Sequence, residues 1–237
     1  MDSTATGLMA FWSNIDPADQ LAFQRWHNCE HIPERVGIEG FLRGRRYRST
    51  HDSDRFLMFY ETRDPQVLGS AAYLAALNAP TARTREALAW FRKPARSVYR
   101  LEQTAGPSVP GASAALATIR FDMGDSGASG ARADAAGAID KARLDMLLES
   151  GLFDRVRIYR SEGKAQATTT NESAIHGALP PPLDGLLLGE SAELGLADRP
   201  EVGERLQQLL LRAFAGTALA GADAELYWLE FALDSGS

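Results

Sequence analysis

The 237-residue sequence has a single cysteine, Cys29, which excludes an internal disulfide. Disulfides are typical of oxidising compartments, and nothing in this sequence indicates one. The sequence shows no charged segment followed by an apolar leader, and no apolar run as long as a membrane-spanning helix. We therefore expect neither secretion nor a membrane span, and we predict a cytoplasmic protein.

A surplus of basic residues is also missing, because the formal net charge is −6. Proteins that bind nucleic acids usually carry such a surplus, since neutralising phosphates drives their affinity. One basic cluster, Arg-Gly-Arg-Arg-Tyr-Arg, lies at residues 43–48. This pattern is typical of the solvated face and end of a strand, and a site for an anionic ligand is the alternative. We predict no nucleic-acid partner.

The common cofactor motifs are absent as well. The sequence has no Gly-x-Gly-x-x-Gly segment, no Walker loop and no Gly-x-Ser-x-Gly nucleophile turn. With 45% hydrophobic and 24% charged residues, the composition is that of a globular protein with a sizeable core. These absences leave no sign of a common cofactor, and we predict none.

Hydrophobic patterning predicts the element order βαββαβ in the first half of the chain. Asp16-Pro17 and Asp64-Pro65 are typical helix starts, because the acid can cap and the proline has no hydrogen bond to lose there. Pro33 should end or kink the first helix, and Gly40 is a predicted chain reversal. The predicted strands are residues 8–15, 41–49, 55–62 and 95–103.

A linker rich in Gly, Pro, Ser and Ala follows at 106–114, and the pattern then begins again. A small, polar segment at 124–137 is predicted to be a mobile loop. The predicted elements of this half are strands at 115–123, 152–161, 186–191 and 224–233 and helices at 139–149 and 202–214.

Short segments of the two halves match in order. The pairs are Gly40-Phe-Leu with Gly151-Leu-Phe, Tyr47-Arg-Ser with Tyr159-Arg-Ser, Tyr60-Glu-Thr with Gly189-Glu-Ser, and Tyr99-Arg-Leu-Glu with Tyr227-Trp-Leu-Glu. The offset is 111 or 112 in the first two pairs and 129 or 128 in the last two, which places one insertion at about 162–184. We predict a first module at 1–105, a linker at 106–114 and a second module at 115–237.

A βαββαβ sheet is antiparallel and carries both helices on one face, so its other face needs a cover. Two such sheets can cover each other and enclose a pocket for a small molecule. We therefore predict an α+β fold in which two fused βαββαβ modules form an intramolecular α/β barrel. The fusion removes the need for a second copy to close the barrel, although exposed helices could still pair into a homodimer.

One segment of the first half resembles a known group. The sequence from Trp26 to Arg35 (Trp-His-Asn-Cys-Glu-His-Ile-Pro-Glu-Arg), followed by Gly40-Phe, Arg46-Tyr-Arg and Phe59-Tyr-Glu, resembles the dimeric α/β-barrel superfamily of ferredoxin-like proteins, and within it the EthD-like small catabolic proteins. The resemblance implies the ferredoxin-like barrel and a pocket between sheet and helices. It leaves the reaction open, because the superfamily includes isomerases, cofactor-free monooxygenases, cyclases, dehydratases and haem enzymes.

Four residues of that segment lie at i, i+3, i+4 and i+7, on one face of a helix: His27, Glu30, His31 and Glu34. A histidine beside a carboxylate can act as acid or base near neutral pH. We predict that His31 is the catalytic acid or base and that Glu30 orients it. The alternative is that His31 anchors the helix end near Pro33 while the glutamates are solvated.

The predicted substrate-binding residues are aromatic or basic. Arg46 or Arg48 could pair with a substrate carboxylate, but side chains alternate along a strand, so only one of Arg46 and Tyr47 can face the pocket. The predicted set is His27, Trp26, Tyr47, Arg46, Trp12 and Tyr60.

A metal site is an alternative for the histidine segment, because His27 to His31 satisfies the H-x-x-E-H string of inverted zinc peptidases. The string lacks a third ligand, and the predicted fold is not that of a peptidase. We therefore predict no metal. The resemblance implies that a haem would take its axial ligand from the second module, where His176 lies in a segment that looks like a loop. Cys29 is predicted to be a small buried hydrophobe, and His51 an exposed turn residue.

The leading hypothesis is a cofactor-independent isomerase, cyclase or lyase that acts on a small, partly apolar acid, lactone or aromatic in catabolism or tailoring. A non-enzymatic, ligand-binding or stress-associated barrel and a haem-binding enzyme are the alternatives.

Overall fold

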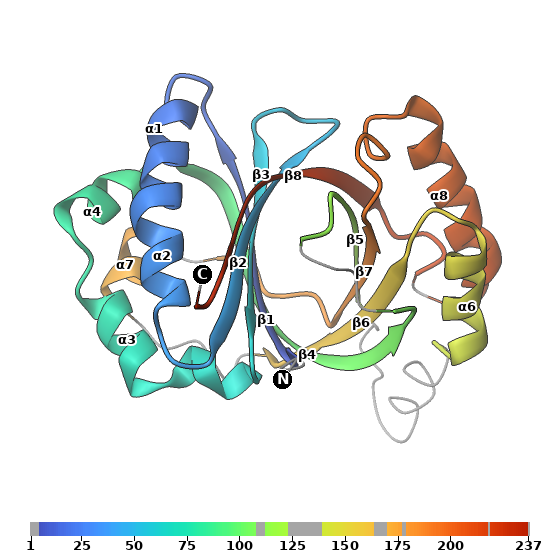
Figure 1. Ribbon diagram of the computed structural model, residues 1–237, viewed down its shortest axis with the longest axis horizontal. Helices are drawn as coiled ribbons and strands as arrows, with labels where there is room; N and C mark the ends of the chain where they lie inside the picture. The colour runs from blue at the N-terminus through green and yellow to red at the C-terminus, as the bar shows by residue number, and fades with distance from the viewer. Residues whose placement is uncertain are drawn as a thin grey trace. The chain divides into compact units, whose positions relative to one another are not determined.

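The computed structural model describes residues 5–107, 112–122, 139–163, 170–176, 179–217 and 219–236. Within them, β-strands alternate with helices in the predicted order (Figure 1). The predicted loop at 124–137 and the middle of the predicted linker, 108–111, lie outside the described residues.

The strands hydrogen-bond in the order β1-β3-β2-β8-β5-β7-β6-β4, which closes a barrel. The chain therefore has the predicted α+β fold of two fused ferredoxin-like modules. The strands are β1 (Gly7–Ile15), β2 (Phe41–Ser49), β3 (Arg55–Thr62), β4 (Phe91–Ala105), β5 (Ala115–Phe121), β6 (Arg155–Ser161), β7 (Gly185–Ser191) and β8 (Ala224–Asp234).

By its contacts the chain divides into two compact units. Unit 1 comprises Met1–Arg100, Glu162–Pro182 and Glu230–Ser237, and unit 2 comprises Leu101–Ser161 and Leu183–Leu229. Antiparallel pairing gives the order β4-β1-β3-β2 in unit 1 and β8-β5-β7-β6 in unit 2. Both are the strand order of a βαββαβ sheet.

The helices of unit 1 lie together beside its sheet (Figure 1). Their apolar side chains, such as Phe23 and Trp26, pack on Phe11 and Met58 of the strands and are buried. The helices are α1 (Gln20–Trp26), the π-helix η1 (His27–His31), α2 (Ile32–Val36), the 3-10 helix η2 (Pro65–Gly69), α3 (Ala71–Asn78), α4 (Ala82–Leu88) and α7 (Asn171–His176).

The two predicted Asp-Pro helix starts behave differently. Asp64 caps as predicted, since its side chain accepts a hydrogen bond from the Gln66 N–H, although the helix that follows is a 3-10 turn. After Asp16 the chain forms a turn instead, closed by a hydrogen bond from the Asp19 N–H to the Asp16 carbonyl. Helix α1 therefore begins at Gln20, three residues after Pro17.

Pro33 does not end the first helix. The five residues before α2 form a π turn, in which the Ile32 N–H donates to the His27 carbonyl five residues back. Pro33 is the second residue of α2 and has no N–H to donate to the turn before it, which is the widened π turn. The helical run continues to Val36, and its histidine segment is wound more widely than an α-helix. Such π turns are frequent at functional sites.

Strand β4 begins at Phe91, earlier than the predicted residue 95. Its register against β1 shifts between Trp12 and Asn14, which marks a bulge. Lys93 has a positive φ of 49° next to this bulge. A bulge accommodates the following proline, Pro94, which cannot donate to the ladder.

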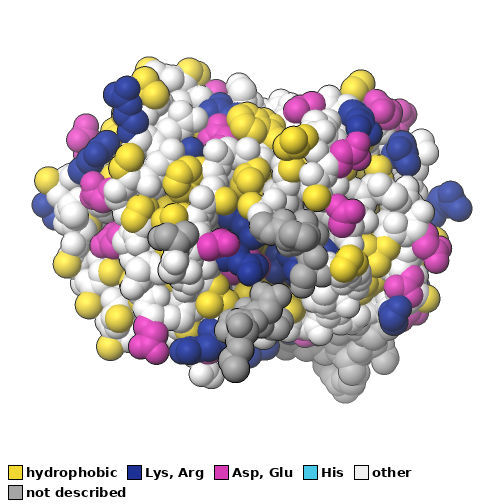
Figure 2. Space-filling view, viewed as in Figure 1, with side chains coloured by type: hydrophobic (Ala, Val, Ile, Leu, Met, Phe, Trp, Pro, Cys, Tyr) yellow, Lys and Arg dark blue, Asp and Glu magenta, His cyan; other side chains and the backbone are white. Residues whose placement is uncertain are grey.

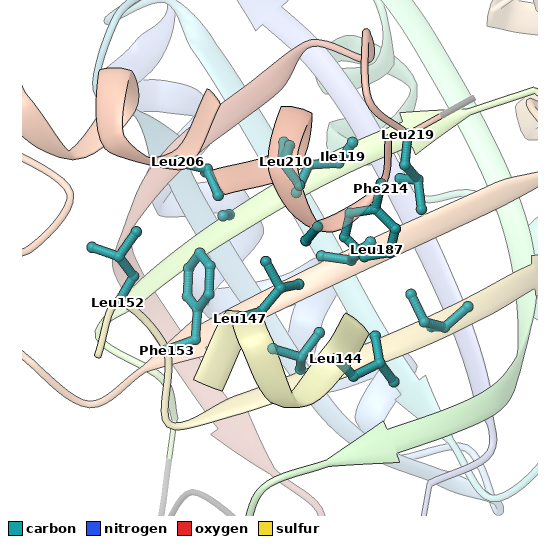
Figure 3. Packing of buried hydrophobic residues seen from close by; sticks show 14 of the residues in the cluster. Ile119, Leu144, Leu147, Leu152, Phe153, Leu187, Leu206, Leu210, Phe214 and Leu219 are labelled. Atoms are coloured by element: carbon teal, nitrogen blue, oxygen red, sulfur yellow. The ribbon is translucent and has the colours of Figure 1, made fainter. Parts of the chain in front are cut away.

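Unit 2 has its own core between its sheet and helices α6 (Lys141–Glu149) and α8 (Pro200–Ala213), which Figure 3 shows from close by. Leu144 and Leu147 of α6 and Leu206 and Leu210 of α8 are all essentially buried. Each buried leucine stabilises the fold by about 1.5–3 kcal/mol. The predicted helical spacing therefore places one apolar face of each helix in this core. No helix among the described residues is long and apolar enough to cross a membrane.

The turn glycines Gly40 and Gly151 occupy matching positions in the two halves of the sequence but differ in their surroundings. Both have positive φ, 92° and 72°. A Cβ at Gly40 would lie 2.7 Å from Val67 Cγ2, whereas a Cβ at Gly151 would meet nothing within 4 Å. In urea unfolding we expect Gly40→Ala to cost about 2–4 kcal/mol and Gly151→Ala about 1 kcal/mol. Equal losses would contradict the contact with Val67.

Candidate active site

The two faces of the unit 1 sheet separate the predicted substrate-binding residues. Arg46 and Tyr60 point toward the helices, since the Arg46 guanidinium lies 5.5 Å from the Phe23 ring centre and Tyr60 belongs to the core that the helices cover. Tyr47 follows Arg46 and Trp12 follows Phe11, a residue of that core, so both lie on the opposite face. The predicted exclusion between Arg46 and Tyr47 therefore places Arg46, not Tyr47, beside the histidine helix.

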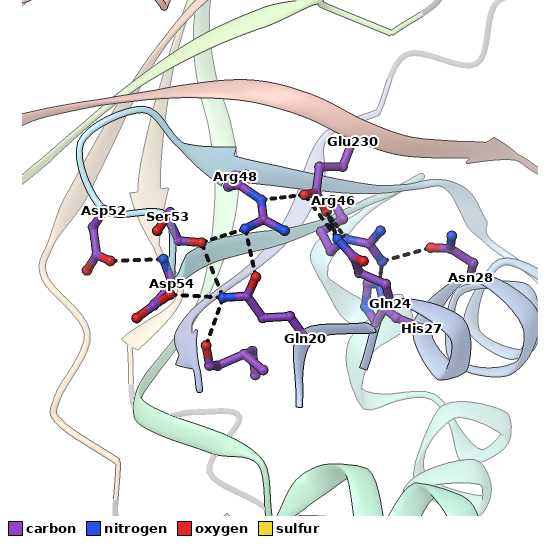
Figure 4. Close-up of polar contacts among 11 residues, drawn as sticks. Gln20, Gln24, His27, Asn28, Arg46, Arg48, Asp52, Ser53, Asp54 and Glu230 are labelled. Atoms are coloured by element: carbon purple, nitrogen blue, oxygen red, sulfur yellow. Dashed lines mark hydrogen bonds and ion pairs between the residues drawn. The ribbon is translucent and has the colours of Figure 1, made fainter. Parts of the chain in front are cut away.

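His27 is buried and has both ring nitrogens engaged. Figure 4 draws it beside Arg46, one of the two partners. Arg46 Nη1 lies 3.2 Å from Nδ1, and Tyr60 Oη lies 3.1 Å from Nε2. Because a guanidinium can only donate, Nδ1 must accept, and the proton of the neutral ring is on Nε2. His27 thus donates from Nε2 to the Tyr60 oxygen. Burial, reinforced by the Arg46 charge, lowers the pKa of His27 well below its ordinary value of 6.5.

This low pKa predicts a pH dependence of stability. Below pH 6.5 His27 is protonated in the unfolded chain but stays neutral in the folded one. The free energy of unfolding therefore decreases as the pH is lowered, by about 1.4 kcal/mol per pH unit. In His27→Asn the amide oxygen can replace Nδ1 as acceptor and does not titrate. Urea unfolding at pH 7.5, 6.5 and 5.5 should show the smaller slope in this variant. Equal slopes would mean that His27 is protonated in the fold.

His31 lies on the same π turn but is only half-buried. Its ring packs on Trp26, with centroids 4.5 Å apart, and stacks on His27 at 5.6 Å and 23°. The edge of Tyr60 lies 6.3 Å from it. Trp26 is itself fixed, because its indole N–H donates to Thr84 Oγ1 at 3.2 Å. The rings of His31, Trp26 and Tyr60 therefore form one packed group.

Glu30 lies near the start of α4. Its Oε1 accepts from Thr81 Oγ1 at 2.5 Å and from Thr84 Oγ1 at 3.1 Å. Thr81 is the N-cap of α4, since its hydroxyl also accepts from the Thr84 N–H. Glu30 thus ties the π turn to the capped end of a neighbouring helix, a contact that its predicted role as orienter of His31 did not include.

Glu230 holds the two predicted carboxylate-binding arginines (Figure 4). Arg46 Nε donates to Oε2 at 2.7 Å and Arg48 Nε to Oε1 at 2.5 Å. Gln24 Nε2 contacts both oxygens at 3.2 Å. Arg46 also donates to the Asn28 side chain at 2.7 Å. The charges of Arg46 and Arg48 are therefore engaged by a carboxylate of the chain itself.

Two predictions about the remaining candidates are wrong. Cys29 is exposed rather than buried, because at about 100° per residue it lies about 200° around the helix from the buried His27. The segment around His176 is not a loop, since His176 is the last residue of α7, which packs on α3 and α4. His51 is exposed in a turn, as predicted. Among the described residues no group of three or more potential ligands could hold a metal ion.

The imidazole of His27 does not fit a haem. An axial ligand needs a ring nitrogen that faces an open cavity. Both nitrogens of His27 are engaged within the protein. The side chain of His176 lies outside the described residues. We therefore derive no step through a haem.

A buried ion pair in unit 1 was not predicted from the sequence. Arg35 of α2 donates to Glu172 of α7 at 2.5 Å, and both side chains are buried. The Arg35 guanidinium also lies 5.5 Å from the Tyr73 ring centre. The two partners are 137 residues apart, so no local pattern connects them.

Two further buried carboxylates, Glu61 and Glu190, stand at matching positions of the two sheets. Glu61 lies opposite Arg43 of β2, and Glu190 lies opposite Arg155 of β6. The next arginine on the same face, Arg45 or Arg157, also contacts the carboxylate. Both glutamates belong to the matching segments of the two halves, and that match was the available signal.

The outer surface near the helices has no single charge. In the part of Figure 2 where Figure 1 draws α1 and α2, basic, acidic and apolar side chains are interspersed. This view therefore gives no indication of a docking surface for a strongly charged partner.

No protein-family model and no curated protein matches the sequence. Solved structures of similar fold include an anthrone oxidase-like protein (10% identity, TM-score 0.61, 98% of this chain and 94% of that one). A monooxygenase from Fusobacterium nucleatum (8%, 0.56, 99% and 96%) and one from Lactobacillus acidophilus (10%, 0.54, 98% and 97%), both described as putative, are also similar. At these identities the likeness establishes only a shared fold, which extends over nearly the whole length of this chain.

Proposed function

We propose that this protein is a cofactor-independent enzyme that moves a proton on a small, partly apolar acid, lactone or aromatic, with His31 as the acid or base. One observation supports this role above the others. Of the two helix histidines, His27 is buried as a neutral ring with both nitrogens hydrogen-bonded, whereas His31 as a residue is only half-buried.

Tyr60 supplies the second group of this proposal. Its oxygen accepts from His27 Nε2, so its own proton can be donated to a ligand oxygen. Burial raises the pKa of the Tyr60 phenol, which keeps it protonated at neutral pH. A donor to a ligand carbonyl stabilises the negative charge that develops when a neighbouring carbon loses its proton. His31 would take that proton from one carbon and return it to another, as an isomerase or cyclase requires.

The proteins of similar fold support an enzymatic role, although not a particular reaction. The anthrone oxidase-like protein and the two proteins described as monooxygenases carry names of small-molecule enzymes. Their names do not distinguish among isomerase, lyase and oxidative chemistry for this chain. The assignment to the EthD-like proteins likewise rests on the helix motif alone and is part of the proposal.

The experiment is a thermal-shift screen of aromatic acids, lactones and phenols, followed by turnover assays of each ligand that binds. A ligand at 100 times its Kd should add about 2.7 kcal/mol of stability. We expect His31→Gln to fold and bind, and to lose turnover by about 100-fold or more. The control is His51→Gln, an exposed histidine, which should be unchanged. Full turnover in His31→Gln would refute the proposed role.

A second candidate is a ligand-binding barrel without turnover. The observation that favours it is the engagement of Glu30 by Thr81 and Thr84, which gives the histidine segment a structural task. In that case His31→Gln would lower the melting temperature, and no ligand of the wild type would be converted.

A further inference from the structure

A chain of side-chain contacts runs from β8 to β3 through the buried ring of His27. Glu230 of β8 accepts from Arg46 Nε at 2.7 Å, and Arg46 Nη1 lies 3.2 Å from His27 Nδ1. On the other side of the ring, Tyr60 Oη of β3 lies 3.1 Å from His27 Nε2. The side chains of Arg46 and Glu230 are 2% and 6% exposed, and His27 and Tyr60 are each 1% exposed. Water therefore competes little with these contacts, and each one influences the next strongly.

The guanidinium of Arg46 is held in one orientation. Its Nη1 carries two hydrogens and has two acceptors within reach, Asn28 Oδ1 at 2.7 Å and His27 Nδ1 at 3.2 Å. Its Nε is bound to Glu230, as Figure 4 shows, and its central carbon lies 5.5 Å from the Phe23 ring centre. The ion pair with Glu230 therefore keeps a hydrogen-bond donor directed at Nδ1.

This donor determines the direction of the hydrogen bond on the far side of the ring. Since Nδ1 has to accept, the proton of His27 is on Nε2 and is donated to Tyr60 Oη. Within the described residues, Tyr60 Oη makes no hydrogen bond other than this one, so its own proton is not used there. In the opposite tautomer of His27, Nε2 would accept that proton and Tyr60 would have none left to donate.

We propose that Arg46, held by Glu230, is a positioning residue that keeps the His27 proton on Nε2 and thereby leaves the Tyr60 hydroxyl as a hydrogen-bond donor for a ligand oxygen. The inference rests on the proposed function, in which Tyr60 supplies that donor. Arg46 acts through two other side chains and does not touch the reacting atoms. This role differs from the substrate contact that the sequence predicted for Arg46.

The first test reads the tautomer of His27 directly, by ¹⁵N NMR of protein labelled in its four histidines at pH 7.5. The His27 signals are identified by their loss in His27→Asn. We expect the Nε2–H form in the wild type. Arg46→Met should lower the ratio of Nε2–H to Nδ1–H by at least about tenfold, because a hydrogen bond from a charged donor is lost. Arg46→Lys should keep the Nε2–H form, since an ammonium also can only donate.

Arg48→Met is the matched control. Arg48 Nε pairs with the other oxygen of Glu230 at 2.5 Å, whereas the nitrogens of His27 bind Arg46 and Tyr60. This variant should keep the Nε2–H form, as should Tyr60→Phe, because Arg46 rather than the phenol fixes the proton. Circular dichroism verifies each fold, and Arg46→Gln, whose amide can accept as well as donate, replaces Arg46→Met if that variant does not fold. A wild-type Nδ1–H ring, an unchanged tautomer in Arg46→Met, or an equal change in Arg48→Met overturns the proposal.

The second test asks whether Arg46 acts through Tyr60. With the compound that the wild type converts in the screen of aromatic acids, lactones and phenols, Arg46→Met should lower kcat by about tenfold or more and change KM less. In a Tyr60→Phe background the same substitution should lower kcat by less than about twofold, because the hydroxyl is already gone. Equal losses in both backgrounds overturn the proposal.

Failure of this inference is distinguishable from failure of the proposed function. Full turnover in His31→Gln, or a wild type that converts none of the compounds, refutes the proposed function, and the tautomer spectra still decide whether Arg46 fixes the proton of His27. Loss of turnover in His31→Gln with no change of tautomer in Arg46→Met upholds the proposed function and overturns the role of Arg46.

Discussion

Glu190→Gln is expected to lower the free energy of unfolding by about 3–5 kcal/mol. Glu190 is the shared acceptor of Arg155, Arg157 and Ser113, and its side chain is 1% exposed. Removing its charge leaves two guanidinium groups in a buried environment without their carboxylate. Breaking a buried ion pair on one side is much more costly than losing a surface pair, because the remaining charge stays desolvated.

Urea unfolding followed by circular dichroism measures this loss. A control variant sets the scale. Glu193→Gln breaks an exposed pair with Arg199 and should change stability by less than about 1 kcal/mol. If Glu190→Gln were as stable as Glu193→Gln, the buried cluster would contribute nothing.

Arg35→Leu is the second substitution with a large expected effect, about 3–5 kcal/mol. It leaves Glu172 buried without the guanidinium that contacts it at 2.5 Å. Burial raises the pKa of Glu172. A raised folded pKa favours the protonated acid, so the variant should recover stability as the pH falls toward the ordinary carboxyl range and lose it as the pH rises.

The double variant Arg35→Leu/Glu172→Leu tests the origin of this loss. Replacing both partners of a buried pair by apolar groups is often nearly neutral, so most of the stability should return. Amide hydrogen exchange in α7 should also be faster in the single variant. The helix loses its ion pair with α2 and keeps the hydrogen bonds between Asn171 and Asn78. A double variant as unstable as the single one would mean that packing, not charge, explains the loss.

Local sequence features were sufficient for most of the fold. Short apolar runs identified the strands, and Gly40, which was predicted to be a chain reversal, has a φ of 92°. The match of the two halves located Glu61 and Glu190 at equivalent positions, and both prove to be buried beside arginines. These features are local because strand periodicity and turn conformation depend on a few neighbouring residues.

The first helix was predicted less accurately. Cys29 was predicted to be buried because cysteine is a small hydrophobe, but at about 100° per residue it lies about 200° around the helix from the buried His27 and is exposed. The π turn, in which His27 stacks on His31, was not predicted. One extra residue in a turn changes the direction of every side chain that follows, and a pattern based on 3.6 residues per turn does not contain that information.

The sequence by itself determined the two-module α+β architecture and the rule that Arg46 and Tyr47 lie on opposite faces of a strand. Only the tertiary structure decided that Arg46 faces the histidine helix and forms an ion pair with Glu230. The same holds for the ion pair between Glu172 and Arg35. The physical reason is distance along the chain: Glu230 and Arg46 are 184 residues apart, so their contact exists only after the sheet has formed. Alternation and capping depend on neighbours, whereas the charge partner of a buried arginine depends on the whole fold.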